Sequence, residues 1–376
     1  MKKTICVIFG GRSGEHEISK RSAKTVVEQI DAERYHVVPL AITNDGAWLN
    51  PAASLALLPE ATQQDYRVRF GDPSEANVAL TGDAKARGLT ILDHDGGVLP
   101  IDVAFPVLHG TFGEDGTIQG LFEMAGIPFV GCGVLASSCG MDKVFMKSLF
   151  SEAGLPICKH VWFLRSEWES SPAAVAAQVE SKIGYPCFVK PANLGSSVGV
   201  SRAVDAEGLA AAISLAAEYD RKIIVEESVE MREIECAVIG NDTPKASLPG
   251  EYVIRDETKK FLDYEEKYAG TGNNEFVVPA RVSDELVQKI RALAIEAFKS
   301  IDGAGLARVD FFLRNDNGAL VVNEINTMPG LTDASGFPKM WSGTGMGFSE
   351  VIDELIELAL SRHADKARNR TDHSQS

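Results

Sequence analysis

The sequence predicts a mixed α/β protein with two or three domains, and three observations support this. Its 376 residues exceed the roughly 150 residues of a typical domain. It is 45% hydrophobic and 24% charged, the proportions of an ordinary globular protein. It opens with an apolar run at 4–10, a glycine-rich turn at 10–14, a helix-like segment at 19–30 and a second apolar run at 36–42. That order is typical of a βαβ unit.

The segments that follow continue the alternation of strands and helices. A strand is expected at 101–109, before a glycine-containing loop and a short helix that stops at Gly126. Later helices are expected from near 142 to 154 and at 171–183, 205–218, 283–300 and 348–361. Later strands are expected at 187–191, 223–227 and 233–239, and on both sides of 316–318.

Three segments do not fit this regular pattern. Residues 51–100 carry weak signals, and we interpret them as a family-variable insertion with a hairpin where 89–93 meets 98–102. The polar segment 251–275 is long for a connection, which is typical of a lid or a binding loop. The tail at 364–376 is polar and aperiodic, and we expect it to be disordered.

Composition and charge exclude several classes of partner. The chain has 37 Lys and Arg against 53 Asp and Glu, and a formal charge of −16 disfavours a nucleic-acid binder. No apolar run approaches the roughly 20 residues that cross a bilayer, and the N-terminal run is too short for a signal peptide. We therefore expect a cytoplasmic protein with no membrane partner. The six cysteines show no CxxC pair and are expected to be reduced and buried.

The most specific pattern lies at 305–330, where two strands flank a short turn. Alternation places Arg308 and Asp310 on one face of the first strand, and Glu324 and Asn326 on one face of the second. With a three-residue turn at 316–318, Asp310 lies opposite Glu324, whereas a two-residue turn would put the acids on opposite faces. Such oxygen ligands suit Mg²⁺ beside nucleotide phosphates. The alternative is a solvent-facing acid pair, which the apolar residues between the acids disfavour.

Two lysines and a small-residue loop form a second candidate site. Lys143 lies in MDKVFMK, Lys190 ends an apolar strand, and GSSVGV follows at 195–200. Backbone N–H groups of such a loop can converge on phosphate oxygens, and a lysine supplies a point charge. A Gly-Ser loop alone is more often a flexible turn. This one lacks the Gly-Lys-Ser/Thr of a Walker A motif, so a classical P-loop protein is disfavoured.

A third candidate follows the first strand, at 10–19. The GxGxxG spacing of a dinucleotide fingerprint is absent, which disfavours a nicotinamide oxidoreductase. Glu15 would repel a pyrophosphate and suits an ammonium group, although a solvated acid before a helix is an equally good interpretation. His109 ends a strand near glycines, and a lone histidine is more often structural. No local Ser-His-Asp or Cys-His motif supports covalent hydrolysis.

Eight motifs, in order along nearly the whole chain, resemble the D-alanine–D-alanine ligase family of the ATP-grasp fold: FGGRSGEHEIS, LHGTFGEDGTIQG, MDKVFMK, FVKPANLGSSVGVS, VEESVEMREIECAV, DYEEKY, ARVDFF and NEINTMPG. The resemblance implies ATP-dependent joining of two D-alanines, for peptidoglycan synthesis, by a homodimer. It implies a substrate-binding domain at 1–109, a central domain at 110–229, a catalytic domain at 230–365 and a disordered tail at 366–376. The active site would lie between the central and C-terminal domains.

The resemblance also assigns residues to ATP and to its metal ions. The residues placed around ATP are Lys143, Lys190, Ser196 and Ser197 at the phosphates, Glu226 and the backbone near Val229 at the adenine, Glu233 at the ribose, and Lys267 at the γ-phosphate. The residues placed around two Mg²⁺ or Mn²⁺ ions are Asp310, Glu324 and Asn326.

Further residues are assigned to the two amino acids. Those that would contact the substrates are Glu15 at the ammonium of the first D-alanine, His109 close to it, Arg308 and the N–H of Gly330 at the oxyanion, and Ser335 at the second carboxylate. Ser196 and Tyr268 would link to Glu15 and close the 251–275 loop over the site. The closed loop would shield an acyl phosphate from water.

Tyr268 also bears on the second substrate, because related ligases that make D-alanine–D-lactate carry a different residue there. The tyrosine favours the dipeptide-forming branch. The alternatives are another ATP-grasp carboxylate–amine ligase, a D-alanine–D-lactate ligase, and a nucleotide-binding regulator without turnover. A regulator would have no use for an oxyanion donor such as Arg308.

Overall fold

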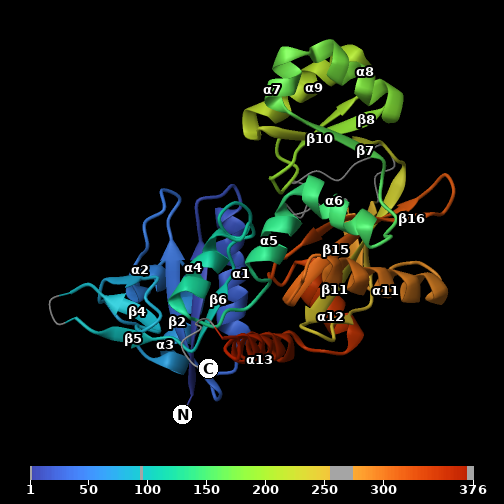
Figure 1. Cartoon of the computed structure of the whole chain (residues 1–376). Coiled ribbons are helices and arrows are strands. Elements are labelled where there is room, and N and C mark those ends of the chain that lie inside the picture. The colour runs from blue at the N-terminus through green and yellow to red at the C-terminus, as the bar shows by residue number, and fades with distance from the viewer. Residues whose placement is uncertain (1, 94–95, 255–273, 371–376) are drawn as a thin grey trace.

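The computed structural model describes residues 2–93, 96–254 and 274–370, and it is a mixed α/β protein built from three lobes. Figure 1 shows an N-terminal lobe, a central lobe that rises above the rest, and a C-terminal lobe beside the first. The last helix runs from the C-terminal lobe along the N-terminal one. The predicted fold class is confirmed.

The N-terminal lobe contains the predicted βαβ unit. Its parallel sheet has the order β2-β1-β6, and its strands are β1 (Lys3–Gly10), β2 (Tyr35–Ile42) and β6 (Val103–Pro106). The helices of this part of the chain are α1 (His16–Gln29), α2 (Pro51–Leu55), α3 (Glu60–Phe70) and α4 (Thr117–Ala125). Because the sheet is covered on both faces, β1 is buried along most of its length, as its continuous apolar run predicted.

The weakly patterned region 51–100 forms two short helices and a small antiparallel sheet. The strands are β3 (Val78–Leu80), β4 (Gly88–Ile91) and β5 (Val98–Pro100), in that order. Since β4 pairs antiparallel with β5, the predicted hairpin is confirmed.

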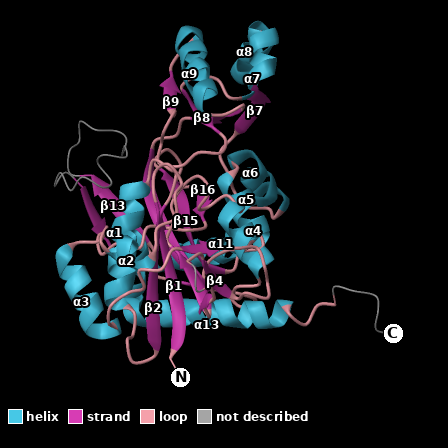
Figure 2. Ribbon diagram, turned by 90° about the vertical axis from the view of Figure 1, so that its left-hand side faces the viewer, coloured by secondary structure: helices cyan, strands magenta, loops and turns pink. Residues whose placement is uncertain are grey.

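The central lobe is one antiparallel sheet with helices on its outer side. The strand order is β7-β10-β8-β9, with β7 (His160–Leu164), β8 (Cys187–Pro191), β9 (Ser201–Ala203) and β10 (Lys222–Glu227). The helices are α7 (Arg165–Ser170), α8 (Pro172–Lys182) and α9 (Ala206–Tyr219). Figure 2 shows these helices above the sheet, which leaves the other face toward the C-terminal lobe.

The C-terminal lobe has a larger sheet of order β14-β13-β11-β15-β16, with β12 paired to β11. Its strands are β11 (Met231–Gly240), β12 (Lys245–Ala246), β13 (Gly250–Ile254), β14 (Asn274–Val277), β15 (Gly305–Arg314) and β16 (Leu320–Asn326). The helices packed on it are α5 (Val134–Met141), α6 (Lys143–Glu152), α11 (Asp284–Ser300) and α12 (Gly336–Thr344).

Several helices pack across the lobes. Phe122 of α4 packs in the core of the N-terminal sheet, beyond the boundary expected at 109/110. Met146 and Phe150 of α6 pack in the core of the C-terminal sheet. Helix α13 (Phe348–Lys366) continues past the expected end at 361 and packs against both α1 and β15. Arg362 fixes α13 by donating to the carbonyls of residues 129 and 131.

Two further expectations can be compared with the described residues. All six cysteines are free, and five of them are buried. In the described ranges, no helix is long and apolar enough to span a membrane.

Gly305 is one position where the backbone requires glycine. Its φ is +73°, and an added Cβ would lie 2.9 Å from the backbone nitrogen of Gly131. We expect Gly305→Ala to lower the free energy of unfolding by about 3 kcal/mol, because it combines left-handed strain with a backbone clash. Gly318 has a similar φ of +68° but nothing within 4 Å of the added Cβ. Urea unfolding of Gly318→Ala should therefore show a loss of only about 1 kcal/mol, and equal losses would contradict the clash.

Candidate active site

The β15–β16 hairpin brings the predicted acidic residues together. Asp310 lies opposite Glu324 and Arg308 opposite Asn326, as the sequence predicted. The pairing closer to the turn differs from the prediction, however. Near the turn Leu313 pairs with Leu320, a register one residue out of step with the predicted one, and it shifts between Asp310 and Phe311. This bulge restores the two acids to one face.

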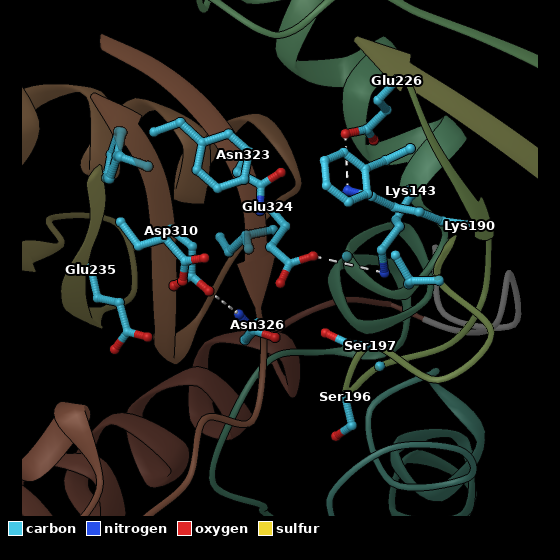
Figure 3. A pocket seen from close by; sticks show the side chains of 18 of the residues that line it. Lys143, Lys190, Ser196, Ser197, Glu226, Glu235, Asp310, Asn323, Glu324 and Asn326 are labelled. Carbon is cyan, nitrogen blue, oxygen red and sulfur yellow. Dashed lines mark hydrogen bonds and ion pairs between the residues drawn. The ribbon is translucent and has the colours of Figure 1, made fainter. Parts of the chain in front are cut away.

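The three candidate metal ligands line one pocket, between the central and C-terminal lobes (Figure 3). Asn326 Nδ2 donates to Asp310 Oδ2 over 3.1 Å, and Glu324 Oε2 lies 3.8 Å from Lys143 Nζ. Within the described ranges, no cluster of three or more His, Cys, Asp or Glu side chains could hold a metal ion. Two carboxylates and an amide nevertheless fit Mg²⁺, which usually takes one or two protein carboxylates and completes its shell with phosphate oxygens and water.

The two predicted lysines face this pocket from the other side. Lys143 begins α6, where Asp142 caps the helix by accepting from the N–H groups of Val144 and Phe145. Lys143 Nζ donates to the carbonyl of Leu194 over 2.8 Å, so it lies beside the loop at 195–200. Ser196 and Ser197 of that loop both have a positive φ, +55° and +57°. Such strain in non-glycine residues costs about 1–3 kcal/mol each and is concentrated at functional sites.

Glu226 lines the pocket and lies between two lysines. Its Oε2 accepts from Lys190 Nζ over 3.0 Å, and its Oε1 lies 3.3 Å from Lys147 Nζ. The side chain of Glu226 is 3% exposed. Burial alone would raise the pKa of Glu226, but Lys147 and Lys190 outweigh it and lower the pKa to about 2. Glu226 is therefore ionised at neutral pH. Val229 and Glu233 line the pocket nearby.

Arg308 is held between two carboxylates. It donates to both oxygens of Asp310, over 2.6 Å each, and its Nε lies 3.4 Å from Glu235 Oε1. The bidentate geometry orients the guanidinium. An ion at Asp310 would compete with Arg308 for the carboxylate, and Glu235 could then keep the arginine in place. Sequence reasoning missed Glu235, although strand alternation from Glu233 puts both on one face.

Glu15 is joined to the phosphate-side loop across the lobes. Ser196 Oγ donates to Glu15 Oε1 over 2.5 Å, which is the contact that the resemblance implied. Glu15 directly precedes α1, and its Oε2 would be 2.7 Å from a Cβ placed on Gly110. A side chain at 110 would displace the Glu15 carboxylate, and the φ of +76° at this position also favours glycine.

His109, Gly330 and Ser335 belong to a connected group behind Glu15. His109 is buried, with Nδ1 2.9 Å from the carbonyl of Met328 and Nε2 2.9 Å from Ser22 Oγ. Burial lowers the pKa of His109, but Glu114 and Glu15 outweigh that effect and raise it overall. Ser335 Oγ lies 2.7 Å from where a Cβ on Gly330 would be. His109 thus connects the N-terminal lobe to the loop after β16.

The structure does not test every predicted site residue. Lys267 and Tyr268 lie outside the described residues. Among the others, Glu15, His109, Arg308, Gly330 and Ser335 lie outside the pocket's lining, whereas the predicted ATP and metal residues that are described line it. Sequence reasoning also missed Lys147. Val144, Lys147 and Phe150 share the buried side of α6, so a lysine on an apolar stripe was the available signal.

Two β lobes that enclose a pocket with lysines on one side and carboxylates on the other define an ATP-grasp protein. Comparison with known proteins makes the family specific. The family model described as "D-ala D-ala ligase N-terminus" matches residues 4–132, and "D-ala D-ala ligase C-terminus" matches 149–357. The chain belongs to the D-alanine–D-alanine ligase family.

Relatives and solved structures agree with this assignment over the full length. The D-alanine–D-alanine ligase of Ruminiclostridium cellulolyticum is 47% identical over 375 residues, with 98% of each chain covered. The solved VanG D-Ala:D-Ser ligase from Enterococcus faecalis has a TM-score of 0.81 at 36% identity, covering 96% of this chain and 100% of that one. The D-alanine–D-alanine ligase from Coxiella burnetii has a TM-score of 0.80 at 33% identity, covering 98% of both.

Proposed function

We propose that this chain uses ATP to join two D-alanines into D-alanyl-D-alanine, for peptidoglycan synthesis in the cytoplasm. One observation carries the proposal. A single pocket has Lys143 and Lys190 on one wall, and Asp310, Glu324 and Asn326 on the other. Phosphoryl transfer to an anionic carboxylate needs positive charge around the phosphates and a place for metal ions.

In the first step, the carboxylate of one D-alanine attacks the γ-phosphorus of ATP, forming an acyl phosphate and releasing ADP. Lys143, Lys190 and the backbone of the 195–200 loop would bind the phosphates, with Lys267 at the γ-phosphate. Asp310, Glu324 and Asn326 would hold two Mg²⁺ or Mn²⁺ ions, which supply charge neutralisation when bound. Glu226, the backbone near Val229, and Glu233 would orient the nucleoside.

In the second step, the neutral amine of the other D-alanine attacks the acyl carbon, and inorganic phosphate leaves as the peptide bond forms. Arg308 and the N–H of Gly330 would stabilise the tetrahedral oxyanion. Glu15 would hold the first ammonium group, with His109 close by, and Ser335 would hold the second carboxylate. Ser196 and Tyr268 would connect the lid to Glu15 and exclude water.

The assignment of lobes follows from these roles. We propose that the N-terminal lobe binds substrate and that the central and C-terminal lobes enclose ATP, with the functional divisions near 109, 229 and 365. We also propose a homodimer, on the resemblance alone.

The proposal predicts ATP-dependent release of phosphate with D-alanine as the sole amino acid, in step with dipeptide. Phosphate and product should be measured together, by a coupled assay and by mass spectrometry. Parallel reactions with D-alanine plus D-lactate or D-serine test the second substrate, because one structural neighbour is a D-Ala:D-Ser ligase. If the depsipeptide or D-alanyl-D-serine is the main product at neutral pH, the second substrate is D-lactate or D-serine and not D-alanine. Nucleotide binding without phosphate release would favour a regulator.

A further inference from the structure

We propose that Lys147 is a positioning residue, the permanent counter-ion of Glu226, and that it thereby leaves Lys190 available to the nucleotide's phosphates. This inference rests on the proposed function. The family resemblance assigns Lys143 and Lys190 to the phosphates, but it gives no role to Lys147, the last lysine of MDKVFMK.

The geometry separates Lys147 from the lysines that would contact ATP. Its side chain is 1% exposed, against 14% for Lys190, and it lies outside the pocket's lining within the described residues. Its Nζ lies 3.3 Å from Glu226 Oε1 and donates to the carbonyl of Asn323 over 3.1 Å. Lys147 can therefore bind the carboxylate without reaching a ligand in the pocket.

The second contact explains how Lys147 keeps its place. Asn323 lies at the bulge, where the register between β15 and β16 shifts, so Asn323 has no residue paired with it on β15. A bulge leaves backbone groups outside the ladder, and such a carbonyl needs a donor from elsewhere. Lys147 supplies that donor, and it joins helix α6 to β10 and to the strand that carries Glu324.

The charges in this group show why two lysines face one carboxylate. Glu226 carries −1 and each lysine +1, so the trio has a net charge of +1. Burial lowers the pKa of Lys190, but the charges of Glu226 and Glu324 outweigh burial and raise the pKa overall, so Lys190 stays charged. If Lys190 turns toward a phosphate, Glu226 would be left as a buried, unpaired carboxylate unless Lys147 remains beside it. Lys147 removes that penalty.

The test measures how much the phosphates contribute to binding. Dissociation constants for adenosine and for ADP with Mg²⁺ are measured by calorimetry. The dissociation constant for adenosine divided by that for ADP gives the phosphate contribution to binding, and this quotient is the ratio used below. Lys147→Met keeps the length of the side chain and removes its charge, so the trio falls to zero. We expect the ratio to fall about tenfold, while adenosine binding changes less than about threefold.

A double variant separates charge from structure. Lys147→Met with Glu226→Gln restores a net charge of +1, so the ratio should return to within about threefold of wild type. Glu226→Gln alone gives +2 and should not lower the ratio. If Lys147→Met alone does not fold, a ratio for the double variant within about threefold of that for Glu226→Gln supports the proposal, and a ratio about tenfold lower in the double variant overturns it.

Arg362→Met is the matched control, because it also removes a cation bonded to backbone carbonyls, but on α13. It should lower the thermal midpoint and leave the ratio unchanged. An equal loss of adenosine and ADP affinity in Lys147→Met, or no recovery in the double variant, would overturn the inference. Wild-type protein that binds no ADP would overturn the proposed function, and this inference with it.

Discussion

Glu324→Gln is expected to abolish ligation while the fold survives. The residue lies on β16 opposite Asp310 and faces Lys143 across the pocket. In the proposed function Glu324 would help to hold the metal ions, a role that needs full negative charge, whereas the amide of glutamine supplies one neutral oxygen. Turnover should fall by about a thousandfold or more, since the ions offset charge in the phosphoryl transfer. The measurement is phosphate release with D-alanine at saturating ATP and Mg²⁺.

Stability should change little, because the carboxylate is 29% exposed and its ion pair with Lys143 is long, at 3.8 Å. Binding of Mn²⁺ in the presence of ADP, followed by electron paramagnetic resonance, gives a readout independent of turnover and should weaken. Asp316→Asn on the same hairpin is the control, since Asp316 pairs with Arg314 at the exposed turn. Near-normal turnover in Glu324→Gln with an unchanged thermal transition would refute the metal role.

The hairpin shows how far a sequence can predict such a site. Alternation was enough to place Arg308 with Asp310, and Glu324 with Asn326, each pair on one face of its strand. The relation between the two strands depended on the turn, and the register near the turn differs from the prediction by one residue. The apolar residues between the acids are buried on the opposite face of each strand, which directs both acids to the same face of the sheet. The bulge between Asp310 and Phe311 allows this despite the different register near the turn. Bulges leave little local signal, so the route could not be predicted.

The sequence also does not predict which lobe a buried helix packs against. The apolar stripe of α4, with Ile118 and Phe122, shows that the helix is buried on one side, but the stripe does not identify the sheet that covers it. The same holds for α13, which contacts two lobes. An apolar stripe therefore shows that a helix is buried, but it does not show which sheet the helix packs on.

Lys147 illustrates a different limit. A lysine on the buried side of a helix is unusual, and the spacing from Val144 to Phe150 displays it. Its partner, Glu226, lies 79 residues away in the sequence, on a strand of another lobe. Local patterns identify groups that need a partner, and tertiary structure is required to find which partner they have.

Arg308→Lys is expected to lower kcat by a factor of about 10² to 10³, with a smaller effect on the KM for ATP. Lysine keeps the charge but loses the planar fork that binds both oxygens of Asp310. An ammonium at this position would be poorly aligned with the oxygen of the tetrahedral intermediate. The measurement is steady-state dipeptide formation, with ADP affinity determined in parallel.

The same strand provides a closely matched control. Arg314 donates to both oxygens of Asp316, two residues away, and its Nη1 lies 3.4 Å from Glu227. Arg308 has the same relation to Asp310 and lies 3.4 Å from Glu235. Arg314→Lys therefore breaks an equivalent bidentate pair at the exposed end of the hairpin, and it should leave kcat within about threefold of wild type. Similar losses in the two variants would show that Arg308 supports the strand and does not face the oxyanion.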